Sequence, residues 1–163
     1  MWKITFFLIF ILTTTLYSQE IFEGLKLEGK EPIVISANEL SFNSSEKLAI
    51  YKGNVVAQRK DVKIYSDEVR IYFDEKNKIK KIIALGNVKI IDKKGRFALS
   101  NVATYYVDAE KIVLSGDAKI QQDSNALESE EIVFYLKNKK VEATGSVKTI
   151  IFPKKKKKNA SSL

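Results

Sequence analysis

The chain has 163 residues, no cysteine and no histidine, and its 28 Lys and Arg residues outnumber its 20 Asp and Glu residues. The length favours a single domain. The missing cysteine and histidine exclude disulfides, thiol and imidazole nucleophiles and the usual zinc sites, so we expect no enzyme and no cofactor or metal site. The net positive charge is compatible with an anionic partner, whether nucleic acid, a membrane surface or a phosphorylated ligand.

The N-terminus has the pattern of a signal peptide. One positive charge, Lys3, precedes an almost wholly apolar run at residues 4–12, and Ser18 offers a small residue for cleavage. The run is shorter than the roughly 20 apolar residues that a membrane-spanning helix needs. We therefore predict a signal peptide over residues 1–18, with an uncleaved membrane anchor as the alternative. Residues 19–30 are expected to lead into the folded domain.

Two short themes recur along the rest of the chain. The first, a glycine followed by a small polar and an apolar residue, begins at Gly53, Gly86, Gly116 and Gly145, at spacings of 33, 30 and 29 residues. The second places small polar residues within an apolar alternation, and the copies read Ser36-Ala37-Asn38, Ser66-Asp67, Ser100-Asn101 and Ser129-Glu130. Together the themes predict four internal repeats, in which each glycine pair forms a turn between short strands.

Apolar and polar residues alternate with a period of two inside each repeat, as in half-buried strands. No long segment shows the spacing of an amphipathic helix. Four short strands in each repeat would give about sixteen antiparallel strands between residues 31 and 153. The sequence therefore predicts an all-β fold, and a sandwich, a jelly roll and a solenoid all fit this pattern.

The alternation gathers apolar side chains on one face of the predicted sheets. This face is either a dry core or, where two sheets splay apart, a wall suited to acyl chains, which are bound through contact area rather than hydrogen bonds. The candidate lipid-binding residues on this face are Ile33, Ile35, Leu40, Phe42, Ile64, Val69, Ile71, Phe73, Ile90, Tyr105, Val107, Ile120, Phe134 and Leu136.

Motifs for catalysis or phosphate binding are missing from the sequence. We interpret the acidic clusters at Asp67-Glu68 and at residues 128–131 as solvated strand faces. Five lysines at residues 154–158 repel one another, so residues 154–163 are predicted to be a disordered tail that aids solubility or is attracted to anionic lipid. A nucleic-acid partner is not expected, because we find no exposed aromatic platform on which bases could stack.

Three stretches of the chain resemble the LptA/OstA-like family of periplasmic lipopolysaccharide-transport proteins. They are Pro-Ile-Val-Ile-Ser-Ala-Asn at residues 32–38, the Gly53-Asn54-Val55 turn, and Leu-Ser-Gly-Asp-Ala-Lys-Ile-Gln-Gln-Asp-Ser-Asn at residues 114–125. The resemblance extends over residues 31–153. It implies a periplasmic location and an OstA-like β-jelly roll of sixteen antiparallel strands in two facing, V-shaped sheets.

The resemblance also implies a ligand and partners. The family binds the lipid A acyl chains of lipopolysaccharide between its sheets, at positions that correspond here to Ile33, Ile35, Ile90, Tyr105 and Val107. Members associate head to tail and bridge LptC-like inner-membrane and LptD-like outer-membrane domains of the same type. Two alternatives stay open: an LptC-like component that keeps its membrane anchor, and a structural β-repeat module without a ligand.

Overall fold

The computed structural model describes residues 25–27 and 30–153, and this part of the chain contains strands and no helix. The strands are β1 (Val34–Ser36), β2 (Glu39–Asn43), β3 (Leu48–Arg59), β4 (Val62–Phe73), β5 (Ile79–Asp92), β6 (Phe97–Tyr106), β7 (Lys111–Gln122), β8 (Asn125–Tyr135), β9 (Lys140–Thr144) and β10 (Lys148–Ile150). The predicted all-β class is confirmed. The predicted signal peptide (1–18) and lysine tail (154–163) lie outside the described residues.

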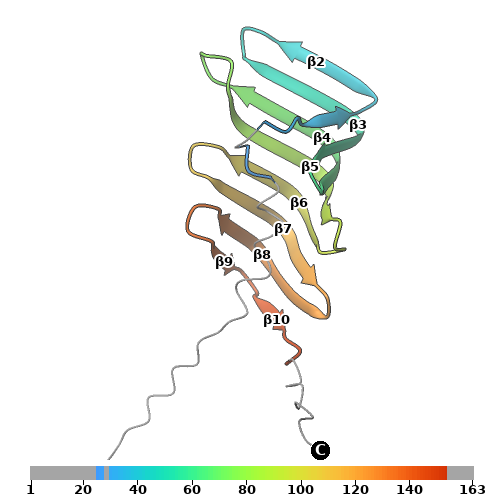
Figure 1. The fold of residues 1–163 in the computed structure, drawn as a ribbon, viewed down its shortest axis with the longest axis vertical. Coiled ribbons are helices and arrows are strands. Elements are labelled where there is room, and N and C mark those ends of the chain that lie inside the picture. The colour runs from blue at the N-terminus through green and yellow to red at the C-terminus, as the bar shows by residue number, and fades with distance from the viewer. Residues whose placement is uncertain (1–24, 28–29, 154–163) are drawn as a thin grey trace, which may run out of the picture.

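All ten strands belong to one antiparallel sheet in the order β1-β3-β4-β5-β6-β7-β8-β10 (Figure 1). Strands β1 and β2 pair with successive parts of β3, and β9 and β10 pair with successive parts of β8. The first and last strands of the chain therefore form the two edges of the sheet. The prediction of about sixteen short strands in two facing sheets is not confirmed: the described residues form ten strands in one sheet, because most predicted pairs of short strands are single long strands.

The reason lies at the glycine theme, which forms β-bulges rather than the predicted turns. The pairing of β3 with β4 shifts register between Lys52 and Val55, where Gly53 and Asn54 have φ angles of +76° and +48°. Glycine adopts this left-handed region freely and asparagine tolerates it. A bulge bends a strand without ending it. The equivalent shifts in β5 and β7 lie between Leu85 and Val88 and between Ser115 and Ala118.

The second theme supplies the side chains that cover these glycines from the neighbouring strand. A Cβ atom on Gly116 would lie 2.7 Å from the Asn101 Nδ2 atom, closer than real Cβ atoms approach. The same relation joins Asn38 to Gly53, Asp67 to Gly86 and Glu130 to Gly145. The two themes therefore occur together because they meet across adjacent strands. The division of the chain into four repeats remains a prediction.

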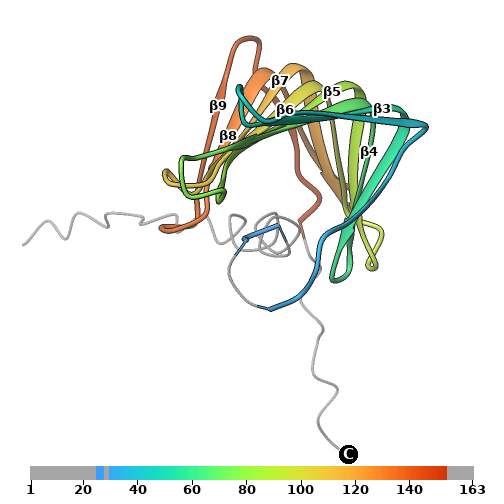
Figure 2. The same ribbon diagram turned by 90° about the horizontal axis from the view of Figure 1, so that it is seen from above.

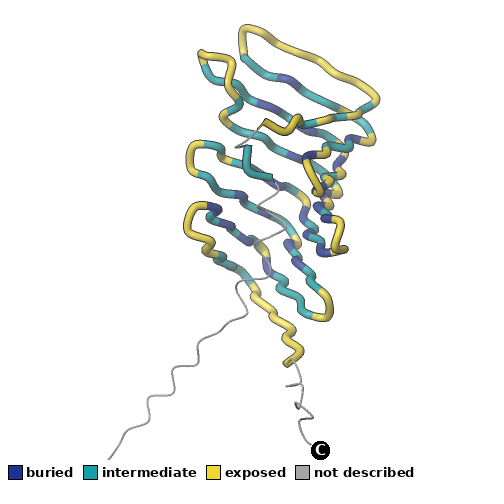
Figure 3. Tube along the Cα trace, viewed as in Figure 1, coloured by how far each residue is buried: buried dark blue, intermediate teal, exposed yellow. Residues whose placement is uncertain are grey.

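The line of bulges bends the sheet into an arch with an apolar concave face (Figure 2). The most deeply buried large side chains on this face belong to Phe134, Ile90, Leu114, Ile132, Val55 and Val88. Burial is greatest along the middle strands, whereas β2, β10 and most hairpin ends are exposed (Figure 3). The concave face is therefore closed by its own side chains only in part.

Replacement of Gly116 by alanine tests the bulge geometry. Gly116→Ala introduces both left-handed strain and the clash with Asn101, so we expect a loss of roughly 2–4 kcal/mol in the free energy of unfolding. Gly95→Ala is the matched control, since Gly95 has φ +77° but nothing lies within 4 Å of the position that a Cβ atom would take there. Strain alone should then cost about 1 kcal/mol. Urea denaturation of both variants measures the difference.

A second substitution separates the clash from other effects. Asn101→Gly in the Gly116→Ala background removes the obstructing side chain, so part of the lost stability should return. Equal destabilisation by Gly116→Ala and Gly95→Ala, with no recovery in the double variant, contradicts the role assigned to the bulge.

Candidate functional site

An apolar groove occupies the concave face over the N-terminal half of the sheet. The empty space between its walls is about 730 Å³, a volume that includes open solvent. Its lining residues are Leu25, Leu27, Ile33, Ile35, Ala57, Gln58, Arg59, Val62, Ile64, Val69, Ile71, Ile82, Ala84, Ile90, Ala103, Tyr105 and Ile112. The wall is almost wholly aliphatic, which suits a hydrocarbon ligand.

Half of the candidate lipid-binding residues line this groove, namely Ile33, Ile35, Ile64, Val69, Ile71, Ile90 and Tyr105. The others lie elsewhere, for three different reasons. Leu40 and Phe42 are exposed on the edge strand β2, and Phe73 packs against Phe42 with ring centroids 6.2 Å apart. Ile120, Phe134 and Leu136 are buried in the core away from the groove. Val107 follows the end of β6, beyond the groove.

Several residues that line the groove are not among the candidates predicted from the sequence. Ile82 and Ala84 point inward on β5 with the same alternation as Ile90, so the period of two was a sufficient signal for them. The residues Leu25 and Leu27 carried no such signal, because they precede the first strand and approach the groove only through the tertiary fold.

The described residues ahead of β1, 25–27 and 30–33, lie on the concave side of the arch (Figure 2), where Leu25, Leu27 and Ile33 line the groove. We call these residues the N-terminal strap. The Arg59 guanidinium donates a hydrogen bond to the Lys26 carbonyl. The Glu31 carboxylate lies 3.8 Å from the Arg59 guanidinium and 3.7 Å from the Lys60 ammonium. The strap is therefore held by both apolar and ionic contacts.

The pKa of Glu31 lies below its usual value. The largest cause is a hydrogen bond from its own backbone amide, and the charges of Lys60 and Arg59 act in the same direction. A carboxyl whose folded pKa is depressed stabilises the fold above its unfolded pKa, and this contribution is lost as the pH falls through the folded value. Acid is therefore expected to weaken the attachment of the strap.

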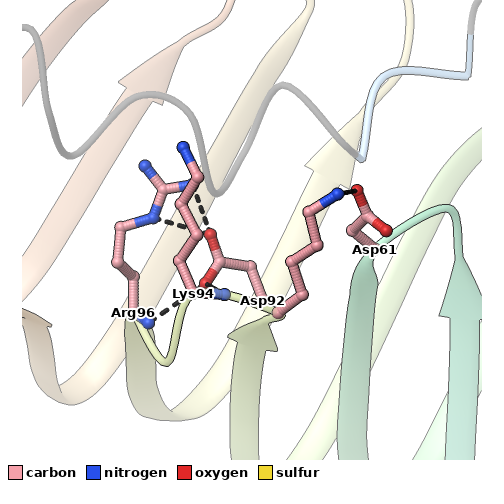
Figure 4. Close-up of polar contacts among 5 residues, drawn as sticks. Asp61, Asp92, Lys94 and Arg96 are labelled. Carbon is pink, nitrogen blue, oxygen red and sulfur yellow. Dashed lines mark hydrogen bonds and ion pairs between the residues drawn. The ribbon is translucent and has the colours of Figure 1, made fainter.

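The β3–β4 hairpin, whose turn follows Arg59, and the β5–β6 hairpin lie side by side and carry two ion pairs (Figure 4). The Asp92 carboxylate accepts hydrogen bonds from the Arg96 Nε atom at 2.6 Å and from the Lys94 and Arg96 amides at 2.9 and 3.0 Å. Both side chains are buried, so this pair is shielded from water. The Asp61 carboxylate pairs with the Lys93 ammonium at 2.5 Å, but that pair is exposed.

Breaking these two ion pairs should lower the free energy of unfolding by very different amounts. Asp92→Ala leaves a buried guanidinium and two hairpin amides without their carboxylate, so we expect a loss of about 3–5 kcal/mol in the free energy of unfolding. Asp61→Ala, the matched control, breaks an exposed pair and should cost about 0–1 kcal/mol. Chemical denaturation tests both; similar costs for the two variants contradict the contrast in burial.

Acidic clusters elsewhere in the described residues hold strands together. The Glu128 carboxylate lies 3.0 Å from the Lys119 ammonium and 3.5 Å from the Lys148 ammonium, and the hydrogen bond from Lys119 is the main cause of its lowered pKa. The Asp67 carboxylate accepts a hydrogen bond from Asn87 at 2.8 Å. Within the described part of the chain, no group of acidic side chains is arranged to hold a metal ion, and no helix is long and apolar enough to cross a membrane.

The convex face carries a row of tyrosine and lysine side chains. The row alternates tyrosine with lysine across six adjacent strands, in the order Tyr72, Lys81, Tyr106, Lys111, Tyr135 and Lys140. Tyr106 is exposed, whereas Tyr72 and Tyr135 are half-buried, so the predicted lack of an exposed aromatic platform stays a prediction. Each ring has a lysine ammonium over it, at 4.3, 5.1 and 5.7 Å from the ring centroid. These contacts occupy ring faces on which bases would stack.

Comparison with known proteins identifies relatives of this fold and groove. Residues 34–140 match the family described as LptA/(LptD N-terminal domain) LPS transport protein. The lipopolysaccharide export system protein LptH of Pseudomonas aeruginosa is 28% identical over 166 residues, which cover 91% of this chain and 94% of LptH. The crystal structure of LptH, described as the LptA-homologous periplasmic component of a lipopolysaccharide transport device, has a TM-score of 0.66 at 21% identity. That match covers 76% of this chain and 96% of the LptH chain, and it shows a shared fold. With its family match spanning most of the sheet, the chain belongs to the LptA and LptD N-terminal domain family of lipopolysaccharide transport proteins.

Proposed function

We propose that this protein carries lipopolysaccharide through the periplasm, with the lipid A acyl chains held in the groove. The observation that carries the proposal is an apolar groove on the concave face of a sheet that does not close on itself. Membership of the family and the periplasmic description of the Pseudomonas relative support it. The role is one of binding and transfer, without catalysis.

The groove wall explains why acyl chains would be the recognised part of the ligand. Ile35 and Tyr105 are only half-buried and face the groove beside fully buried Ile90. Covering such a surface with hydrocarbon stabilises the complex by about 0.8 kcal/mol for each buried methylene. Because the wall has few fixed hydrogen-bonding groups, it accepts flexible tails of varying position.

Substitution of groove residues by aspartate tests this binding. Ile35→Asp or Tyr105→Asp places a carboxylate in the apolar wall, so we expect loss of lipopolysaccharide capture while the far-ultraviolet β-signal is retained. Tyr106→Asp is the matched control, since Tyr106 points to the convex side of the same strand and should bind normally. Photo-crosslinking to lipopolysaccharide measures capture; unchanged crosslinking in both groove variants rules out the groove as the binding site.

We also propose that copies of the chain associate head to tail through the two sheet edges. The described edges expose apolar side chains, Val34 and Leu40 on one edge and Ile150, Ile151 and Phe152 at the other. Open edges offer unpaired backbone groups to another strand. Pairing of two different edges does not close, so it extends into a filament. LptC-like and LptD-like domains of the same type are the proposed partners at its two ends.

A mixture of two edge variants tests this assembly. Leu40→Lys and Ile150→Lys each place a charge on one edge, where lysine disfavours pairing. We expect each variant alone to stay monomeric, because every head-to-tail contact would include its charged edge, and the wild type to grow with concentration in sedimentation experiments. An equimolar mixture should form complexes through the two unmodified edges. Unchanged growth of both single variants contradicts the edge contact.

The alternatives can be distinguished by simple measurements. A periplasmic carrier should be released from the membrane fraction with a new N-terminus near Gln19, whereas an LptC-like component would keep its N-terminus and stay with the membrane. A structural module with a dry core would show no rise in melting temperature with any lipid.

A further inference from the structure

We propose that Arg59 forms a binding site for the anionic phosphate headgroup of the lipid, and that Glu31 occupies this site while no lipid is bound. The inference rests on the proposed carrier function and adds recognition of the headgroup to it. Its basis is a buried guanidinium in the wall of an otherwise apolar groove.

Arg59 is the last residue of β3 and lies opposite Val62 of β4, with both side chains in the groove lining. Only 5% of Arg59 is exposed. Burying a guanidinium is costly unless hydrogen-bond acceptors surround it. Two of its partners come from the strap: the Lys26 carbonyl accepts a hydrogen bond from the guanidinium, and the Glu31 carboxylate forms an ion pair with it at 3.8 Å. A segment that pairs with no strand at these positions thus contributes to the partners of a buried charge.

The chemistry of this end of the groove suits a phosphate. A guanidinium can bind two phosphate oxygens at once, which makes arginine the preferred residue for bidentate recognition. Basic side chains outnumber acidic ones around Glu31 and in the β3–β4 and β5–β6 hairpins. The basic residues are Arg59, Lys60, Lys93, Lys94 and Arg96, and the acidic residues are Glu31, Asp61 and Asp92. The Lys60 ammonium already lies 3.7 Å from the Glu31 carboxylate and could contact the same phosphate.

The strap has the chemical layout of an amphiphile. Leu25 and Leu27 lie in the apolar groove, while the Glu31 carboxylate lies at the Arg59 guanidinium. An anionic lipid would place its tails and its phosphate at the same two kinds of site. Binding would then exchange the leucines for acyl chains and the carboxylate for phosphate, so that Arg59 is never left without an anion or a carbonyl.

The experiment compares two probes, lipid A and the same lipid with its phosphates removed. Wild type should prefer the phosphorylated lipid by roughly tenfold or more, the scale of hydrogen bonds to a charged group. Arg59→Gln should lose this preference and keep its affinity for the dephosphorylated lipid. Lys63→Gln, which removes one charge from the exposed neighbouring strand position, is the control and should keep the preference.

A second variant tests the competition with the strap. Glu31→Gln weakens the ionic attachment without changing the groove, so its affinity for lipid A should rise severalfold. Inorganic phosphate alone should neither bind measurably nor release bound lipid A, because it has no tails to displace the leucines. If Arg59→Gln does not fold, Arg59→Lys replaces it and should reduce the preference, since an ammonium loses the two-point contact.

The outcomes separate this inference from the carrier function. Binding of both lipids with the same preference in Arg59→Gln and wild type overturns the headgroup site and leaves the groove intact. Unaltered lipid A affinity in Glu31→Gln overturns the exchange with the strap. Failure of wild type to bind either lipid overturns the carrier function and the headgroup site together.

Discussion

The whole arrangement depends on the left-handed bulges that cross the sheet in a line. At Gly53, Gly86, Gly116 and Gly145 a side chain from the adjacent segment fills the space that a Cβ atom would need. Because both residues of the glycine pair adopt positive φ, the strand changes direction but keeps pairing on either side. Repetition of this bend at the same level of successive strands curves the sheet, and the curvature creates one concave apolar face.

The two halves of that concave face are used differently. Toward β8 it is filled by large side chains such as Phe134, Leu114 and Ile132, which are almost completely buried. Toward β3 the lining includes the small residues Ala57, Ala84 and Ala103, which leave room that the strap enters. Both halves share one pattern of alternation, but the groove lies toward the N-terminal strands.

Local patterns were predictable from the sequence, and long-range placement was not. The period of two is a property of each strand alone, so the inward direction of Ile64, Ile71 and Ile90 could be predicted. Leu40 and Phe42 have the same alternation but are exposed, because β2 lies at the edge of the sheet. That edge position could not be predicted, since it leaves no pattern in the residues of β2 itself. The glycine theme was interpreted as turns because turns and bulges need the same left-handed backbone. The strap depends on contacts between residues 33 positions apart, such as Lys26 and Arg59, which no periodicity records.

The proposed assembly and the proposed groove are linked by the same line of bulges. Both edges of the sheet are interrupted at this level, between β1 and β2 at Asn38 and between β9 and β10 at Gly145 and Ser146. An edge-to-edge contact between copies would therefore align the interrupted edge of one copy with that of the next at the level of the bulges. The concave face of one copy would then continue into the next. Because Ile35 lies on β1, at the edge itself, the groove wall reaches the edge at which this contact is proposed. A lipid held by its acyl chains would then pass between copies without exposing those chains to water. Such exposure is unfavourable, because transfer of apolar surface into water costs free energy.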